Sequence, residues 1–154
     1  MQTETITYQD GDVSCHGFVA WDESISGPRP GVLISHAWAG QDQFERDKAV
    51  QLAEMGYVGF AVDNYGGGTL GSNNDENAAL MTPFVEDRAM LRRRLLAGLT
   101  AMQSLDVVDT DRCGAMGYCF GGLCALDIAR SGADVRGVVS FHGLLNGITG
   151  LDAN

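Results

Sequence analysis

The sequence has little positive charge. Ten Lys and Arg residues stand against 20 Asp and Glu residues, which gives a formal net charge of −10. A surface of that sign repels a phosphate backbone, so the composition argues against a nucleic-acid-binding protein. Charged residues are scarce overall, at 19%, whereas hydrophobic residues make up 45% of the 154 positions. This balance excludes an intrinsically disordered chain and predicts a single domain over residues 1–154.

Long apolar runs and closely paired cysteines are also missing. No run approaches the roughly 20 apolar residues that span a membrane, and the polar N-terminus lacks the pattern of a signal peptide. We therefore predict a cytoplasmic protein without membrane contacts. The four cysteines are Cys15, Cys113, Cys119 and Cys124, and none forms a Cys-x-x-Cys pair. This spacing argues against a structural zinc site, and we predict neither a metal nor a cofactor.

The chain does contain an alternation of short apolar runs and helical patterns. In chain order, the patterns predict strands over 3–8, 13–21 and 31–35, a helix over 44–55, a strand over 57–62, a helix over 83–104, a strand over 112–116, a helix over 121–130 and a strand over 135–141. The first two strands form a hairpin about a turn at 10–12, and residues 66–77 form a polar loop.

The order of these elements predicts an α/β fold. After the hairpin, strands and helices alternate, which is typical of a mainly parallel sheet with helices on both faces. No predicted helix follows the last strand to cover it. We therefore expect the chain to end before the last strands of such a domain. This would leave a bare sheet edge through which two copies could pair as a dimer.

One short segment carries the pattern of a nucleophile. Gly117-Tyr118-Cys119-Phe120-Gly121 matches Gly-x-nucleophile-x-Gly, between a predicted strand and a predicted helix. In this pattern the nucleophile occupies a strained turn, where side chains at Gly117 or Gly121 would collide with neighbouring elements. The turn lifts the Cys119 sulfur above the carboxyl edge of the sheet, and the start of the helix favours the thiolate. The backbone N–H of Phe120 is then free to donate to a developing oxyanion.

A second oxyanion donor is expected from the loop after the strand over 31–35. We predict the amide of Ala37 as this donor, with the amide of Trp38 as the alternative. The Trp38 ring is a candidate wall of a substrate pocket, although core packing explains it equally well. His36 is another pocket candidate, and a hydrogen bond that orients the loop is the simpler role for it.

These segments resemble the dienelactone hydrolase family, and the resemblance covers nearly the whole chain. The matching segments are Pro30-Gly31-Val32-Leu33-Ile34-Ser35-His36, Gly56-Tyr57-Val58-Gly59-Phe60-Ala61-Val62-Asp63-Asn64-Tyr65-Gly66, Gly117-Tyr118-Cys119-Phe120-Gly121-Gly122 and Val138-Val139-Ser140-Phe141-His142-Gly143. The resemblance implies an α/β-hydrolase fold and a Cys-His-Asp triad with Cys119 as nucleophile. It also implies attack on small carboxylic esters or lactones, an acyl-enzyme intermediate and release of the acid by water.

Two departures from the family pattern affect the site. The best-known members carry a Glu that interacts with the resting thiol where this chain has Ala37, so control of the Cys119 thiol is expected to differ. Family members also hold a substrate carboxylate with arginines. Arg88 is the candidate for that role here, and the alternative for it is a surface ion pair with Glu86 or Asp87.

The remainder of the triad is a larger departure. In this fold the acid and the histidine follow the nucleophile in the chain, each after a later strand. The histidines are His16, His36 and His142, and none matches the family's base. His142 instead follows the strand after the elbow, a position that normally shapes the pocket. We therefore predict an incomplete triad and little activity for residues 1–154 alone.

Two other interpretations are open at this point. A class I glutamine amidotransferase or a DJ-1-like protein also places a cysteine on a strand-to-helix elbow. A non-catalytic protein of the same fold, which binds a small molecule, would explain the missing acid and histidine.

Overall fold

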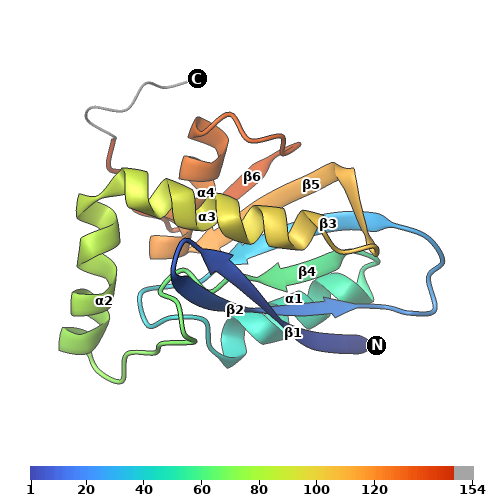
Figure 1. The fold of residues 1–154 in the computed structure, drawn as a ribbon, viewed down its shortest axis with the longest axis horizontal. Helices are drawn as coiled ribbons and strands as arrows, with labels where there is room; N and C mark the ends of the chain where they lie inside the picture. The colour runs from blue at the N-terminus through green and yellow to red at the C-terminus, as the bar shows by residue number, and fades with distance from the viewer. Residues whose placement is uncertain (148–154) are drawn as a thin grey trace.

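A computed structural model describes residues 1–147. Its strands are β1 (Gln2–Asp10), β2 (Val13–Trp21), β3 (Arg29–Ser35), β4 (Val58–Ala61), β5 (Val108–Tyr118) and β6 (Val138–Phe141). Its helices are α1 (Gln43–Glu54), α2 (Asn74–Glu86), α3 (Arg88–Gln103) and α4 (Phe120–Arg130). Figure 1 shows the strands side by side at the centre, with α3 running across them.

The strands of the described residues form one sheet in the order β1-β2-β4-β3-β5-β6. The hairpin of β1 and β2 is antiparallel and pairs with β4, whereas β4, β3, β5 and β6 run parallel. Gly11 closes the hairpin with a φ of 58°, a conformation that glycine adopts without strain. The predicted α/β fold, with its opening hairpin and mainly parallel sheet, is confirmed.

Helices cover both faces of this sheet. On one face α1 packs against β2, β3 and β4, where Ala49 and Ala53 meet Ile34 in a small apolar cluster. The other face is covered by α3 and α4, whose apolar side chains join the larger core. Members of this core from the two helices are Leu91, Leu95, Leu99, Met102, Phe120, Leu123 and Ile128. The end of β5, directly before Cys119, therefore belongs to a sheet that is covered by helices on both faces.

The predicted helix over 83–104 is wrong in its extent, because two helices occupy this region. α2 begins at Asn74, inside the predicted polar loop, where the Asn73 side chain accepts a hydrogen bond from the Glu76 N–H over 3.0 Å. The break falls at Asp87, whose carboxylate accepts the Met90 N–H over 2.9 Å and caps α3. Helix-forming residues lie on both sides of the break, so the spacing of apolar residues does not reveal it.

The predicted boundaries of the last two strands are also shifted. β5 begins at Val108 instead of 112, and β6 begins at Val138 instead of 135. β6 forms one edge of the described sheet, where Val139 and Phe141 are 51% and 41% exposed. A dimer through this edge stays a prediction.

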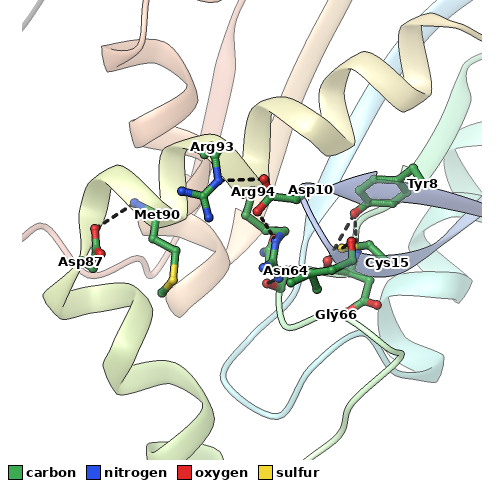
Figure 2. A network of polar contacts seen from close by, with 11 residues as sticks. Tyr8, Asp10, Cys15, Asn64, Gly66, Asp87, Met90, Arg93 and Arg94 are labelled. Atoms are coloured by element: carbon green, nitrogen blue, oxygen red, sulfur yellow. Dashed lines mark hydrogen bonds and ion pairs between the residues drawn. The ribbon is translucent and has the colours of Figure 1, made fainter.

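A buried ion pair ties the hairpin to α3 and to the segment after β4. The Arg94 Nε donates to the Asp10 carboxylate over 2.7 Å, and the Arg94 Nη1 donates to the Asn64 carbonyl over 2.9 Å (Figure 2). Arg93 reaches the second oxygen of Asp10 over 2.8 Å from a more exposed position. Because Asp10 and Arg94 are both buried, losing Asp10 would leave the Arg94 guanidinium in the core without this counter-ion.

Candidate active site

Cys119 stands on a strained turn between β5 and α4. Its φ of 55° and ψ of −113° lie in a region that non-glycine residues rarely adopt. The Cys119 N–H donates to the Phe141 carbonyl over 3.0 Å, which ties the turn to the end of β6. All four cysteines lie within residues 1–147, and three of them are buried whereas Cys119 is partly exposed. The strained residue is therefore also the cysteine of residues 1–147 that is not buried.

Glycines make this turn sterically feasible. A Cβ on Gly117 would overlap the backbone of Gly121, and a Cβ on Gly121 would overlap the carbonyl group of Ser35. A Cβ on Gly122 would come within 2.6 Å of the Gly143 Cα. The helix α4 thus lies directly against the ends of β3 and β5, as the predicted elbow requires.

The first amide of α4 has no hydrogen-bond partner in the described residues. Within residues 1–147, the Phe120 N–H donates to no other group, whereas the Cys119 carbonyl already accepts from Gly122 and Leu123. The Phe120 ring is fully buried and lies 6.0 Å from the Tyr65 ring, nearly parallel to it. The packed ring holds the start of α4 in place, and the Phe120 N–H is unpaired. An oxyanion donor must have such an unpaired N–H.

His36 is buried between the loops that follow β3 and β4. Its Nδ1 lies 2.6 Å from the Ala37 carbonyl, and its Nε2 lies 3.2 Å from the Asn64 N–H. The Asn64 amide is a donor, so Nε2 accepts and Nδ1 carries the proton. Burial lowers the pKa of His36, which keeps the ring neutral. Both ring nitrogens are thus used to orient the loop, and neither is left for a substrate.

The Ala37 peptide groups are held in fixed directions. The Ala37 N–H donates to the Glu45 carboxylate over 3.4 Å, so this predicted oxyanion donor already has a partner. The Ala37 carbonyl lies near His36 Nδ1 and accepts the Gly40 N–H over 3.2 Å. In a trans peptide the next N–H points away from that carbonyl. This N–H belongs to Trp38, and it has no hydrogen-bond partner within residues 1–147.

The loop after β4 braces the loop after β3. The Tyr65 hydroxyl donates to the Trp38 carbonyl over 2.8 Å, and the Gly71 N–H donates to the Ala39 carbonyl over 2.9 Å. The loop after β4 is itself folded around Asp63, whose carboxylate accepts the N–H groups of Gly66 and Gly68, each over 2.8 Å. These contacts make the backbone beside Cys119 a rigid frame.

Glu45 is a residue of this region that the sequence interpretation missed. It is the third residue of α1 and 2% exposed. Its second oxygen accepts the Asp42 N–H over 3.0 Å and completes a capping box. Burial raises its pKa to about 7, with a further contribution from the negative charge of Asp42. The pattern Asp-x-x-Glu before an apolar helix was the available signal, but it indicates a cap and not a contact with the loop after β3.

Arg88 is buried, so the predicted surface ion pair with Glu86 or Asp87 is wrong. Its Nε and Nη2 donate to the two oxygens of Asp127 on α4, over 2.7 and 2.6 Å. Its Nη1 also lies 3.4 Å from the Asn146 carbonyl. The guanidinium therefore joins α3, α4 and the chain after β6. A role in holding a substrate carboxylate stays a prediction, and this pairing does not favour it.

The three histidines, all within residues 1–147, do not complete a triad. None forms a hydrogen bond with the Cys119 thiol in the described part of the chain. His16 lies on β2 with its Nδ1 3.3 Å from the Thr7 hydroxyl. His142 follows β6 with a φ of 40°, exposed, its ring centroid 6.2 Å from that of Tyr118. The predicted pocket roles of His142 and Trp38 stay predictions.

Over residues 1–147, no three His, Cys, Asp or Glu side chains lie together in a way that could hold a metal ion. No helix in this range has the length and apolar character needed to cross a membrane.

Known proteins resemble the chain in sequence and in structure. A probable 2-oxo-3-(5-oxofuran-2-ylidene)propanoate lactonase of a Bradyrhizobium species is 30% identical over 151 residues, which cover 94% of this chain and 60% of that protein. A crystal structure of a dienelactone hydrolase-like promiscuous phosphotriesterase from metagenomic libraries has a TM-score of 0.92 and 35% identity, over 97% of this chain and 62% of the other. A dienelactone hydrolase from Anabaena variabilis, at 21% identity over 92% of this chain and 63% of its own, shares the fold with a TM-score of 0.67.

The chain spans about three fifths of the length of these relatives. The family model described as the dienelactone hydrolase family matches residues 16–153, which is most of the sequence. With the elbow, the sheet order and these matches in agreement, the chain belongs to the dienelactone hydrolase family.

Proposed function

We propose that the chain carries the nucleophile of a hydrolase acting on small carboxylic esters or lactones, and that Cys119 is this nucleophile. The observation that carries the proposal is the Cys119 backbone, strained at a φ of 55° at the start of α4 in a residue that is partly exposed. Such strain persists only where the surrounding structure holds it, and it concentrates at functional sites. The relative named as a lactonase supports lactones within the substrate class.

In the proposed reaction, the Cys119 thiolate attacks the carbonyl carbon and forms a tetrahedral oxyanion. Collapse of this intermediate expels the alkoxide, which takes up a proton, and leaves a thioester on Cys119. Water then attacks the thioester, releasing the acid and restoring the thiol. We assign the Phe120 and Trp38 amides as the oxyanion donors, because the Ala37 amide, our sequence-based choice, donates to Glu45.

The second half of the reaction requires a base for the attacking water. No histidine of residues 1–147 bonds to the Cys119 thiol, so this half lacks its activating group in the described structure. We therefore expect this 154-residue chain to accept an acyl group and to release it slowly. Family membership favours this hydrolase over the amidotransferase and DJ-1-like interpretations.

The test is a reaction of the 154-residue chain with p-nitrophenyl acetate. We expect a burst of about one p-nitrophenolate per chain, and mass spectrometry should place one acetyl group on the peptide that contains Cys119. The matched control is Cys124→Ser, which changes a buried cysteine one helical turn further on and should keep the burst. Cys119→Ser should lose it. A chain that stays unacetylated at residue 119 would instead support the non-catalytic binding protein.

A second candidate substrate class is suggested by the solved relative. That protein is described as a promiscuous phosphotriesterase, and it shares 35% identity with this chain. A phosphotriester also develops negative charge on an oxygen that the same two amides could stabilise. Incubation with paraoxon would distinguish the classes, because attack by Cys119 leaves a diethylphosphoryl group on its peptide.

A further inference from the structure

We infer that Glu45 controls the reactivity of the Cys119 site by its charge: the neutral side chain permits acylation and the ionised side chain opposes it. The inference rests on the proposed function, which supplies the oxyanion on which the charge would act. Glu45 touches neither the nucleophile nor the proposed donors. It acts through space, from behind the loop that presents the Trp38 amide.

The position of the Glu45 carboxylate supports this role. A capping-box glutamate needs only the amide of the N-cap residue, here Asp42. In this chain the side chain is 2% exposed, and its other oxygen reaches across to the Ala37 N–H over 3.4 Å. The carboxylate therefore sits against the peptide that precedes the proposed Trp38 donor.

In the described part of the chain, no cation is paired with this carboxylate. Within residues 1–147, Glu45 forms no ion pair, and the neighbouring Arg46 turns instead to Gln41, over 3.2 Å. The titratable groups that face it are the carboxylate of Asp42 on the helix cap and the phenol of Tyr118 at the end of β5. Both are acids. Burial and the Asp42 charge raise the pKa of Glu45 to about 7, so both charge states are populated near neutral pH.

Charge, and not loop geometry, is expected to dominate the effect. The loop after β3 keeps its bonds to His36, Tyr65 and Gly71 whichever form Glu45 takes. In contrast, an oxyanion bound to the Trp38 amide would lie within about 10 Å of the carboxylate, given the lengths of the intervening bonds. At an effective dielectric constant of about 20, repulsion over that distance changes a rate by roughly tenfold.

The experiment compares two reactions of Cys119 on the 154-residue chain. Acetylation by p-nitrophenyl acetate passes through an oxyanion, whereas alkylation by iodoacetamide does not. Both require the thiolate, so the ratio of their rate constants cancels the ionisation of the thiol. We expect this ratio to fall roughly fivefold as the pH rises from about 6 to about 8, because about a tenth of the Glu45 side chains are still neutral at the higher pH. In Glu45→Gln the ratio should stay high and constant with pH. The matched control Glu54→Gln, at the exposed end of the same helix, should behave like the wild type.

The outcomes separate this inference from the proposed function. If Cys119 is acetylated but the ratio does not change with pH, or if Glu45→Gln follows the wild-type fall, the Glu45 inference is wrong and the nucleophile stands. If Cys119 is never acetylated, the proposed function fails and the inference fails with it. Should Glu45→Gln not fold, NMR of the wild type decides. The Ala37 amide resonance must titrate with the same midpoint as the ratio, and a resonance that does not titrate overturns the inference.

Discussion

At the scale of single residues, the site depends on glycines, which have no side chain to collide with neighbouring backbone. Gly117 and Gly121 face each other across the elbow, and Gly121 also presses on the carbonyl of Ser35 at the end of β3. The neighbours of a new methyl group here are backbone atoms, which cannot rotate away as a side chain can. The strained φ of Cys119 therefore persists because β3, β5 and α4 are packed at van der Waals distance around it.

Gly121→Ala should accordingly destabilise the fold and disturb Cys119, the proposed nucleophile. Overpacking of this kind costs about 1–3 kcal/mol, and we expect the free energy of unfolding in urea to fall by that amount. The acetylation burst of Cys119 should fall as well. Gly137→Ala is the matched control, because a Cβ there meets nothing within 4 Å and should cause no loss. Equal stability of the two variants would contradict the packing argument.

At the scale of elements, buried ion pairs join helices that are distant in sequence. Asp127 on α4 accepts from Arg88 on α3 and also from Arg130, one turn along its own helix, over 2.9 Å. Arg88 and Asp127 are both buried, at 9% and 1% exposure. A buried carboxylate that loses its partner is costly, so this pair holds α4, and with it the elbow, in place against α3.

Arg88→Ala should therefore lower the free energy of unfolding by about 3 kcal/mol, the low end for breaking a buried pair, because Arg130 still faces Asp127. Chemical denaturation monitored by circular dichroism measures this change. The control is Arg136→Ala, whose exposed pair with Asp134 spans 3.7 Å and should contribute less than about 1 kcal/mol. A loss for Arg88→Ala no larger than that of the control would refute a structural role for this cross-link.

At the scale of the whole molecule, Glu45 should make stability depend on pH. Its pKa is raised from 4.5 to about 7 on folding, so the folded state binds the proton more tightly than the unfolded state. The resulting stabilisation is complete below pH 4.5 and is lost as the pH rises through about 7. A shift of this size corresponds to about 3 kcal/mol.

Glu45→Gln removes this titration. We expect the difference in free energy of unfolding, wild type minus variant, to decrease by about 3 kcal/mol between about pH 4.5 and about pH 8. Urea denaturation at several pH values provides the measurement, with Glu54→Gln as the exposed control. A difference that is constant over this range would show that Glu45 is ionised throughout or equally solvated in both states.

Local pattern was sufficient for the order of the strands and for the elbow. Apolar runs and their spacing predict the hairpin, the alternation of strands and helices, and the glycines around Cys119, because these depend on neighbours in the chain. The boundaries failed where a cap intervened. Asp87 divides the predicted helix over 83–104, and Asn73 starts α2 inside a predicted loop. Such caps depend on a few side-chain hydrogen bonds, which periodicity does not register.

The sequence by itself determined the alternating α/β order and the family, and it indicated Cys119 as the proposed nucleophile, since each rests on residues close together in the chain. The tertiary structure decided which polar groups meet. Arg88 faces inward because it pairs with Asp127, 39 positions later in the chain. The second ring nitrogen of His36 accepts a hydrogen bond from Asn64, 28 positions later. The tertiary structure also placed the Glu45 carboxylate on the Ala37 amide and left the Trp38 amide unpaired in the described residues. These partners are brought together by packing across the sheet and its loops, so no local pattern contains them.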